Sequence, residues 1–433
     1  KCRPLTGGAS VSSTLHQNWE QLTLGDLGRV VTGRTPPSSK PELFGDQYPF
    51  ITPTDMAFSD RSIRPERGIS DTGAESLSRI KLPAKTPCFV CIGATIGKLC
   101  LTSEESFTNQ QINSIVVNKD RHNPDFVYYL LRHVSGQVKS LAGGAATPII
   151  NKSAFSEVPV LVPSLEVQES IASILSTYDD LIENNTRRIE ILEEMSRRLY
   201  EEWFAHFRFP GHEEVSFKES ELGKIPEGWE VASLESFGTI LTGKTPSKKK
   251  PELFGSEVPF IKLPDMHGQI FITETTEGLS REGQQSQWKK TVPANSICVS
   301  CIGTGGIVVI TSEPSQTNQQ INTVVPTKSD LREFLYFTAL FLRDDINNYG
   351  ATGATMTNLS RGKFASLKVI APCEEVLSSY SKLAAPMFDL ILNLQRANRS
   401  LRAQRDLLLP KLVSGEIDVS DIPMPDDKEV EAA

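Results

Sequence analysis

The chain of 433 residues contains a long internal repeat. Residues 24–56 recur 210 positions later as residues 234–266, and both segments carry the pattern TGxTPxxxKPELFG. A match of this length is not a chance event. Its period is far longer than the roughly 20–50 residues of solenoid repeats, so the repeat predicts two tandem domains of the same fold.

Shorter matches extend the repeat over most of each half. They pair Cys91-Ile92-Gly93 with Cys301-Ile302-Gly303, residues 108–113 with 317–322, and Phe155 and Pro163 with Phe364 and Pro372. In each half, about 150 residues first alternate β-branched runs with Gly, Pro and Asn, which predicts a mixed α+β domain rich in short strands. One helix is expected over residues 125–138, with its counterpart over residues 331–347.

An apolar stripe with a seven-residue period follows each α+β domain, as in a coiled-coil seam. The first stripe comprises Ile171, Tyr178, Asn185, Leu192 and Leu199, with Leu175, Ile182, Ile189 and Trp203 four residues after. The second comprises Tyr380, Met387, Leu394, Leu401 and Leu408, with Ala384, Ile391 and Leu412 in the other row.

Each stripe needs a partner that removes it from water, and the simplest partner is the other stripe. Because a whole domain separates them, we expect an antiparallel pair that relates the halves by an approximate two-fold axis. The two domains would then lie at opposite ends of a rigid bar, about one turn of B-DNA (~34 Å) apart. Asn185 and Asn398 fall on the seam. They either face each other and fix the register or are tolerated polar residues near solvent.

Pro386 is expected to break the second helix near Ala385, so the long uninterrupted helices are predicted over about residues 179–207 and 387–409. The predicted fold class is α+β, with two such domains separated by two long antiparallel helices. The predicted organisation is a leader or expression remnant (1–17), a first α+β domain (18–162), a central helical region (163–208), a second α+β domain (209–371), a distal helical region (372–418) and an acidic, disordered tail (419–433).

The net charge of −8 argues at first against a nucleic-acid-binding protein. The acidity, however, sits mainly in the helical regions, since residues 163–208 carry 5 basic and 10 acidic side chains. The two α+β domains are close to neutral, which permits DNA binding without indicating it. No apolar run approaches the roughly 20 residues of a membrane span and no signal-peptide pattern opens the chain, so we expect a cytoplasmic protein without membrane contact.

Seven cysteines, an odd number, fit a reducing compartment better than a disulfide framework. The pairs Cys88/Cys91 and Cys298/Cys301 have the spacing that a four-thiolate zinc site needs. Each pair lies in a predicted strand, where side chains three positions apart point to opposite faces. We therefore predict small buried apolar side chains and no metal site.

Three patterns come close to catalytic motifs without matching them. The segment Asn123-Pro124-Asp125-Phe126 has Asp where an adenine methyltransferase needs a second Pro, and no Gly-rich AdoMet loop precedes it. Residues 93–98 are one residue short of a phosphate-binding loop, and residues 303–306 lack its lysine. The six histidines form no HExxH-type cluster. The sequence therefore predicts no catalysis by this chain.

Three segments resemble the specificity subunit of Type I restriction-modification enzymes. They are WEQLTLGDLGRVVTGRTP at the start, YEEWFAHFRFPGH followed by LGKIPEGWEV in the centre, and LLLPKLVSGEI near the end, so the resemblance spans residues 18 to about 418. It implies a non-catalytic protein in which each α+β domain reads one half of a split, asymmetric site in double-stranded DNA. It also implies that the paired helices set the spacing between the halves.

The same resemblance implies the partners and the cofactors. The helical regions would dock two modification subunits, to which two restriction subunits attach. No cofactor is expected in this chain, since AdoMet would bind the modification subunit and ATP and Mg²⁺ the restriction subunit. The alternative is a two-lobed coiled-coil scaffold that binds proteins and not DNA.

Basic and hydroxyl-bearing loops are the candidate DNA contacts. Residues 33–40 (GRTPPSSK) and 243–250 (GKTPSKKK) carry the side-chain types that bind phosphates, although such runs are often only solvated loops. The amides at residues 109–111 and 318–320 are able to bond adenine, yet their identity in both halves favours a shared structural role.

The candidate residues form two sets. The DNA-contact set is Arg34, Thr35, Ser38, Lys40, Lys98, Asn109, Gln110, Lys152, Lys244, Thr245, Lys248, Lys249, Lys250, Lys262, Asn318, Gln319, Arg361 and Lys363. The helix-contact set is Ile171, Tyr178, Ile182, Asn185, Ile189, Leu192, Leu199, Met387, Ile391, Leu394, Asn398, Leu401 and Leu408.

Overall fold

The computed structural model describes residues 19–58, 61–142, 148–350 and 357–420, which form two compact units. Unit 1 combines Lys1–Glu183 with Ser400–Ala433, and unit 2 is Asn184–Arg399. Each unit thus holds one repeated domain and a part of both long helices. The expected leader (1–17) and residues 421–433 of the expected tail lie outside the described residues.

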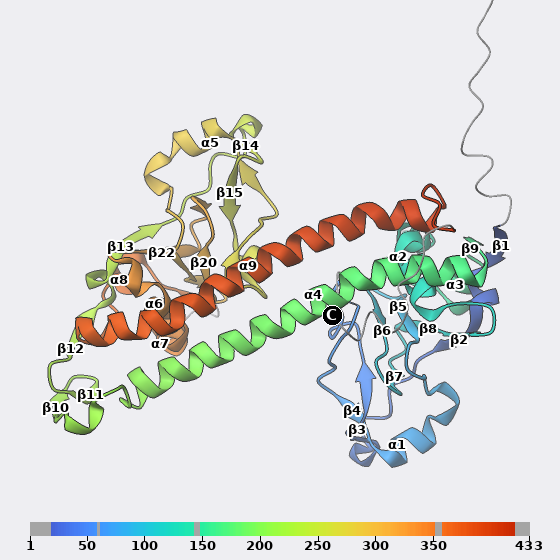
Figure 1. Ribbon diagram of the computed structural model, residues 1–433, viewed down its shortest axis with the longest axis horizontal. Coiled ribbons are helices and arrows are strands. Elements are labelled where there is room, and N and C mark those ends of the chain that lie inside the picture. The colour runs from blue at the N-terminus through green and yellow to red at the C-terminus, as the bar shows by residue number, and fades with distance from the viewer. Residues whose placement is uncertain (1–18, 59–60, 143–147, 351–356, 421–433) are drawn as a thin grey trace, which may run out of the picture. The chain divides into compact units, whose positions relative to one another are not determined.

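Two long helices carry the apolar stripes, α4 (Leu165–Tyr200) and α9 (Glu374–Val413) (Figure 1). Both begin earlier than predicted, and α4 also ends earlier. A π-helical turn, Glu201–Ala205, follows α4, and Phe207 then adopts a left-handed conformation with φ of 58°. A bulky residue rarely adopts that conformation, and here it ends the helical segment.

The predicted break at Pro386 is wrong, because α9 continues through it. A proline inside a helix removes one backbone hydrogen bond, which costs about 3 kcal/mol. Pro386 lies on the exposed side of α9, where water can satisfy the carbonyl that loses its partner. Ala384 and Phe388 on either side are fully buried in the core of unit 2. Their burial holds both halves of the helix in line.

Within each unit, α4 and α9 run antiparallel. In unit 2, Asn185 Nδ2 donates to Asn398 Oδ1 at 2.9 Å, and Ser196 Oγ donates to Met387 Sδ at 3.4 Å. In unit 1, Arg405 forms an ion pair with Asp179. The contacting positions therefore increase along α4 as they decrease along α9. Of the two interpretations left open for the asparagines, the hydrogen bond supports the one in which they face each other across the seam.

Most stripe residues are removed from water. Ile171, Leu175, Ile182, Ile391 and Leu394 are buried. Tyr178, Ile189, Leu192, Leu199, Met387, Leu401 and Leu408 are half-buried. Three of the half-buried residues, Ile189, Leu192 and Leu199, pack against the core of unit 2. The seven-residue period thus identified the packed face of each helix.

Unit 1 is built on a four-stranded sheet of order β2-β8-β5-β6, beside a three-stranded sheet of order β4-β3-β7 and the pair β1-β9. The strands are β1 (Glu20–Thr23), β2 (Gly28–Thr32), β3 (Phe44–Ile51), β4 (Gly68–Ile69), β5 (Pro87–Val90), β6 (Leu99–Leu101), β7 (Phe107–Thr108), β8 (Ile112–Val117) and β9 (Pro159–Val162). The helices are α1 (Asp71–Ser76), α2 (Pro124–Ser140) and α3 (Lys152–Ser156), so the helix expected over residues 125–138 is confirmed.

Unit 2 repeats this plan in the same register. β13 pairs with β22 from Gly238 opposite Pro326, as β2 pairs with β8 from Gly28 opposite Val117. Its sheets have the orders β13-β22-β18-β20-β16, β14-β17-β15-β21, β12-β24, β10-β11 and β19-β23. The first two comprise β13 (Gly238–Thr242), β14 (Phe254–Gly255), β15 (Val258–Ile261), β16 (Phe271–Ile272), β17 (Gly278–Leu279), β18 (Ile297–Ser300), β20 (Val308–Thr311), β21 (Gln316–Thr317) and β22 (Ile321–Pro326). The pairs comprise β10 (Phe217–Ser220), β11 (Gly223–Pro226), β12 (Glu230–Ser233), β19 (Ile302–Gly303), β23 (Thr357–Asn358) and β24 (Lys368–Ala371).

The single helix predicted over residues 331–347 is two helices, α6 (Arg332–Phe341) and α7 (Arg343–Gly350). Residues 333–339 of α6 are all buried, whereas Arg343, Asp344 and Asp345 are exposed. The helix is interrupted at Leu342. The remaining helices of unit 2 are α5 (Arg281–Ser286) and α8 (Arg361–Ala365).

The cysteine side chains enter different core clusters. Cys88 packs with Val31 and Ile112, while Cys91 packs in the cluster around α2 and the ends of α4 and α9. Cys298 and Cys301 are divided in the same way. The predicted opposite faces are confirmed, so neither pair converges on one point. In the part of the chain that the structure describes, no three His, Cys, Asp or Glu side chains are placed to hold a metal ion.

None of the helices formed by the described residues combines the length and the apolar character that crossing a membrane requires.

A half-buried carboxylate between α4 and α6 leads to a stability prediction. Tyr336 OH donates a hydrogen bond to Glu193 Oε1 at 3.1 Å, and burial raises the pKa of Glu193 above its ordinary value of 4.5. The charged form is then less favourable in the folded chain than in the unfolded chain, so it destabilises the fold at a pH above the raised pKa. We expect Glu193→Gln to increase the free energy of unfolding at pH 7, with the gain disappearing as the pH falls below about 4.5.

Urea unfolding at several pH values checks this, and Glu194→Gln is the matched control. Hydrogen bonds from Arg197 and Arg198 lower the pKa of the half-buried Glu194 to about 2. Its charge therefore stabilises the fold above pH 4.5 and loses that effect as the pH falls, so the control variant should be less stable at pH 7. Equal effects of the two variants would contradict the prediction.

Candidate nucleic-acid interface

In both units, the Gly-x-Thr-Pro loop packs on the turn that follows a short strand. A Cβ atom on Gly33 would lie 2.2–2.4 Å from Thr108 Oγ1 and from the Thr108 and Asn109 carbonyl oxygens, so only glycine fits there. Arg34 N donates to Thr108 O at 2.9 Å, and Thr35 Oγ1 donates to Gln110 Oε1 at 2.8 Å.

The matching loop of unit 2 makes the same contacts. Lys244 N donates to Thr317 O at 2.9 Å, and Thr245 Oγ1 donates to Gln319 Oε1 at 2.7 Å. A Cβ atom on Gly243 would again collide with the turn. Two segments that lie about 75 residues apart in the sequence are thus joined at the surface of each unit.

The two asparagines of these turns act inside the fold. Asn109 is 8% exposed, accepts a hydrogen bond from Gln111 N and donates one to Gln111 Oε1, both at 3.0 Å. Asn318 makes the equivalent bonds with Gln320 at 3.0 and 2.9 Å. This geometry favours the structural interpretation of the asparagines, whereas Gln110 and Gln319 are exposed.

Two further loops join the same end of each sheet. Cys91 N donates to Gln111 O at 2.7 Å, and Ile150 N donates to Cys91 O at 2.9 Å. In unit 2, Cys301 N donates to Gln320 O at 2.8 Å, and Leu359 N donates to Cys301 O at 2.9 Å. Short helices begin directly after, α3 with Lys152 and α8 with Arg361. We call this set of four loops the loop edge of each unit: residues 33–40, 91–98, 108–111 and 148–152, and residues 243–250, 301–307, 317–320 and 357–363.

Most of the predicted DNA-contact residues are exposed on the loop edges. Ser38 is exposed and Thr35 and Thr245 are half-buried. The predicted set also includes exposed cations, and none of these forms an ion pair with a carboxylate of the described residues. They are Arg34, Lys40, Lys152, Lys244, Lys248, Lys249, Lys250, Arg361 and Lys363. Cations without an internal partner remain available for phosphate oxygens.

Two predicted residues have partners inside the fold instead. Lys98 Nζ donates to Pro53 O at 2.9 Å. Lys262 forms an ion pair with Glu277, and its ammonium group lies 5.6 Å from the centre of the Phe260 ring. Both side chains are half-buried. The residues next to Lys98 and Lys262 in the sequence do not indicate these partners, because the partners belong to other loops.

A charged network in unit 1 was missed by the sequence patterns. Arg405 is 1% exposed and pairs with Asp179, which also accepts a hydrogen bond from Tyr129 OH at 2.6 Å. Burial, followed by the charge of Asp179, raises the pKa of Tyr129 well above its ordinary value. Arg405 lies seven residues after Asn398 in the second row of the α9 stripe. A cation in an apolar row was the signal that a buried acidic partner exists.

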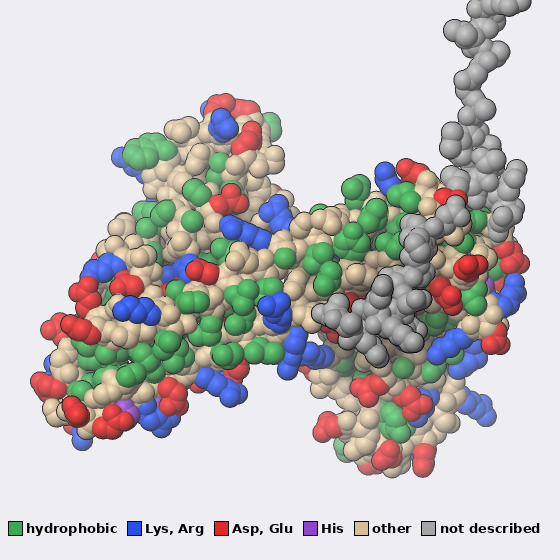
Figure 2. Space-filling view, viewed as in Figure 1, with side chains coloured by type: hydrophobic (Ala, Val, Ile, Leu, Met, Phe, Trp, Pro, Cys, Tyr) green, Lys and Arg blue, Asp and Glu red, His purple; other side chains and the backbone are tan. Residues whose placement is uncertain are grey.

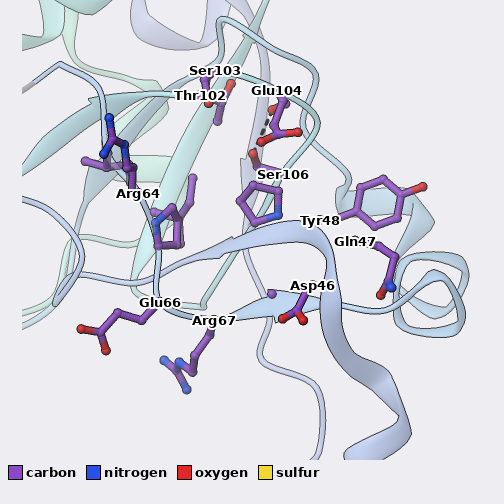
Figure 3. Close-up of a pocket in the computed structure, with 15 residues that line it drawn as sticks. Asp46, Gln47, Tyr48, Arg64, Glu66, Arg67, Thr102, Ser103, Glu104 and Ser106 are labelled. Carbon is purple, nitrogen blue, oxygen red and sulfur yellow. Dashed lines mark hydrogen bonds between the residues drawn. The ribbon is translucent and has the colours of Figure 1, made fainter. Parts of the chain in front are cut away.

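A cleft of about 350 Å³ lies beside β3 and β4 in unit 1 (Figure 3). Its lining mixes Asp46, Glu66, Glu104, Arg64 and Arg67, and none of the predicted DNA-contact residues lines it. Ser106 Oγ donates to Glu104 O at 2.8 Å at its wall. Such a mixed lining favours no single class of ligand.

Comparisons with known proteins agree with these features. A family model described as "Type I restriction modification DNA specificity domain" matches residues 16–194 and 226–376. The Type I restriction enzyme HindI specificity subunit of Haemophilus influenzae is 34% identical over 360 residues, covering 68% of this chain and 77% of that protein. The MjaIX specificity subunit of Methanocaldococcus jannaschii is 28% identical over 413 residues, covering 94% of this chain and 95% of that protein.

The crystal structure of a Type I restriction-modification S subunit from M. genitalium has a similar fold. The TM-score is 0.59 at 16% sequence identity, and the match covers 93% of this chain and 98% of that chain.

Proposed function

Because the chain belongs to the family of Type I restriction-modification DNA specificity subunits, we propose that each unit reads one half of a bipartite, asymmetric DNA site. The observation that carries the proposal is the loop edge, which occurs in both units with the same backbone contacts and unpaired exposed cations. Arginine and lysine side chains on such an edge position the protein on phosphates, while neighbouring polar groups read base edges.

The two loop edges differ where they face solvent. Unit 1 has Pro37-Ser38-Ser39 where unit 2 has Ser247-Lys248-Lys249, on the same supporting turn. A shared scaffold with different exposed side chains is what two readers of different half-sites need. This difference supports an asymmetric target over a palindromic one.

The helix pair is proposed as the spacer between the two readers. At about 1.5 Å per residue, the 36 residues of α4 span ~54 Å and the 40 residues of α9 span ~60 Å. The antiparallel contacts found inside each unit support a rigid pair whose length and register set the distance between half-sites.

The same helices are proposed to dock two modification subunits, to which two restriction subunits attach. Apolar side chains gather over the part of α4 and α9 that belongs to unit 2 (Figure 2), where Ile191 is 45%, Met195 53% and Leu383 52% exposed. Exposed apolar groups of this kind are typical of protein-binding surfaces. In this proposal the chain itself catalyses nothing and binds DNA in the cytoplasm. AdoMet binds the modification subunit, and ATP and Mg²⁺ bind the restriction subunit.

Binding of duplex DNA tests the proposed function. The full chain, alone and with the modification subunit, is mixed with random duplex DNA in a filter-binding assay between about 50 and 200 mM salt. We expect binding that weakens steeply with salt, because each phosphate contact releases counterions. A coiled-coil scaffold for proteins would retain no DNA at any of these salt concentrations, and that result would reject the proposal.

The lysine run of unit 2 gives a sharper prediction. The triple variant Lys248→Ala, Lys249→Ala, Lys250→Ala should bind DNA more weakly, and its slope of log K against log salt should be smaller by up to about 2.7. These side chains are exposed, so the thermal unfolding temperature should not change.

A control with the same change in charge is Lys218→Ala, Lys224→Ala, Lys368→Ala. These lysines lie on β10, β11 and β24, and two of them pair with Glu219 and Glu221. The control should keep the slope of the unmodified protein. Equal slopes for the two triple variants would contradict a specific role of the lysine run.

A further inference from the structure

Two buried positions differ in chemical character between the two repeated domains. In unit 1, Phe107 on β7 packs with Leu77, Phe50 and Ile69 in an apolar cluster. At the matching positions of unit 2, Gln316 and Gln287 replace Phe107 and Leu77, and they are 0% and 8% exposed. Two buried amides are unfavourable unless hydrogen bonds satisfy them.

These amides bind the segment of residues 287–291 to the loop edge of unit 2. Gln287 Nε2 donates to Gln316 Oε1 at 2.7 Å and to Lys244 O at 2.8 Å. Gln316 Nε2 donates to Thr291 Oγ1 at 2.9 Å. The bond to Lys244 O reaches the backbone of the Gly-x-Thr-Pro loop. Leu77, at this position in unit 1, offers no such donor.

This attachment ties the segment that carries Trp288 to the Gly-x-Thr-Pro loop of unit 2. Trp288 is 62% exposed, whereas Trp203 and Trp229 are 6% and 1% exposed. Lys289 Nζ lies 5.6 Å from the centre of the Trp288 ring. Residues 244–250 contain four lysines and residues 287–291 contain two, with no carboxylate in either segment. Unit 1 has Ser78 where unit 2 has Trp288.

We propose that Trp288 and Lys289 form a DNA contact that only the second domain possesses. The indole ring packs against deoxyribose and base edges of the second half-site, while Lys289 and Lys244 bind the flanking phosphates. The ring supplies a large apolar surface at little cost in side-chain entropy, and the surrounding cations supply the attraction to DNA. This inference rests on the proposed function, because it assigns a contact to the same DNA target.

The test uses the full chain assembled with the modification subunit and a labelled duplex carrying its mapped methylation site. We expect Trp288→Ser, which introduces the residue of unit 1, to bind this duplex roughly tenfold more weakly. Trp288→Phe should lose less than about threefold because it keeps an aromatic ring. On a duplex whose second half-site is scrambled, Trp288→Ser and the unmodified protein should bind equally.

Leu222→Ser is the control, since Leu222 is 46% exposed in the turn between β10 and β11, and it should bind like the unmodified protein. Equal binding of the full site by Trp288→Ser and the unmodified protein overturns the inference. A lower unfolding temperature together with equal losses of binding to both duplexes also overturns it, because that result assigns Trp288 a structural role. If the unmodified protein does not bind the duplex, it is the proposed function that fails.

Discussion

Replacing Arg405 by leucine is expected to destabilise unit 1 by about 3–5 kcal/mol. The variant leaves the Asp179 carboxylate, whose side chain is 4% exposed, without its cation. Tyr129 OH still donates to Asp179, but one neutral hydrogen bond does not replace an ion pair for a buried charge. Urea unfolding combined with amide hydrogen exchange measures the loss and assigns it to unit 1.

Two further variants make this prediction specific. Removing both charges with Asp179→Leu and Arg405→Leu should recover much of the lost stability, because no buried charge then remains unpaired. Arg187→Leu breaks a surface pair with Glu190, in which the side chains are 57% and 47% exposed, and should cost less than about 1 kcal/mol. A double variant as unstable as Arg405→Leu alone would show that packing, and not charge pairing, is the function of Arg405.

Inserting four residues after Asn185 is expected to change the recognised DNA site by altering its spacer and not its half-sites. Four helical residues add about 6 Å, which corresponds to roughly one to two base pairs of B-DNA. The loop edges keep their contacts, so each half-site sequence should persist. Mapping methylated adenines in a host that carries the variant reads the new spacer directly, and methylation of the original site should be lost.

An insertion of the same length between Glu221 and Leu222 is the control, because it enlarges the turn between β10 and β11 and leaves both helices intact. Its methylation site should equal that of the unmodified protein. Methylation at the original spacer in a host that carries the insertion after Asn185 would argue strongly that the helices do not set the distance between half-sites.

The repeat and the seven-residue stripes predicted much of the fold because both follow from local spacing. Asn185 and Asn398 could be placed on one seam from their positions alone, and their hydrogen bond agrees with that placement. The opposite faces of the cysteine pairs followed in the same way from the alternation of a strand. Regular periods carry information about which residues share a face.

The errors arose where distant residues decide the outcome. Pro386 remains helical because Ala384 and Phe388 are buried by other elements. The local pattern over residues 331–347 also did not indicate the interruption of the helix at Leu342. The DNA contacts predicted for Lys98 and Lys262 remain predictions, and residue type did not indicate that Pro53 and Glu277 are their partners within the fold. Propensity and residue type do not reveal such partners.

The core of unit 1 includes Leu409, Leu412, Val413 and Val419 from the last part of the described chain, beside Ile171 and Leu175. During synthesis, all residues of unit 2 leave the ribosome before these four do. The apolar face at the start of α4 therefore lacks these partners, and is open to water and to chaperones, until all residues of unit 2 have been synthesised. The two cores are therefore expected to be completed in the order opposite to that in which the two repeated domains are translated.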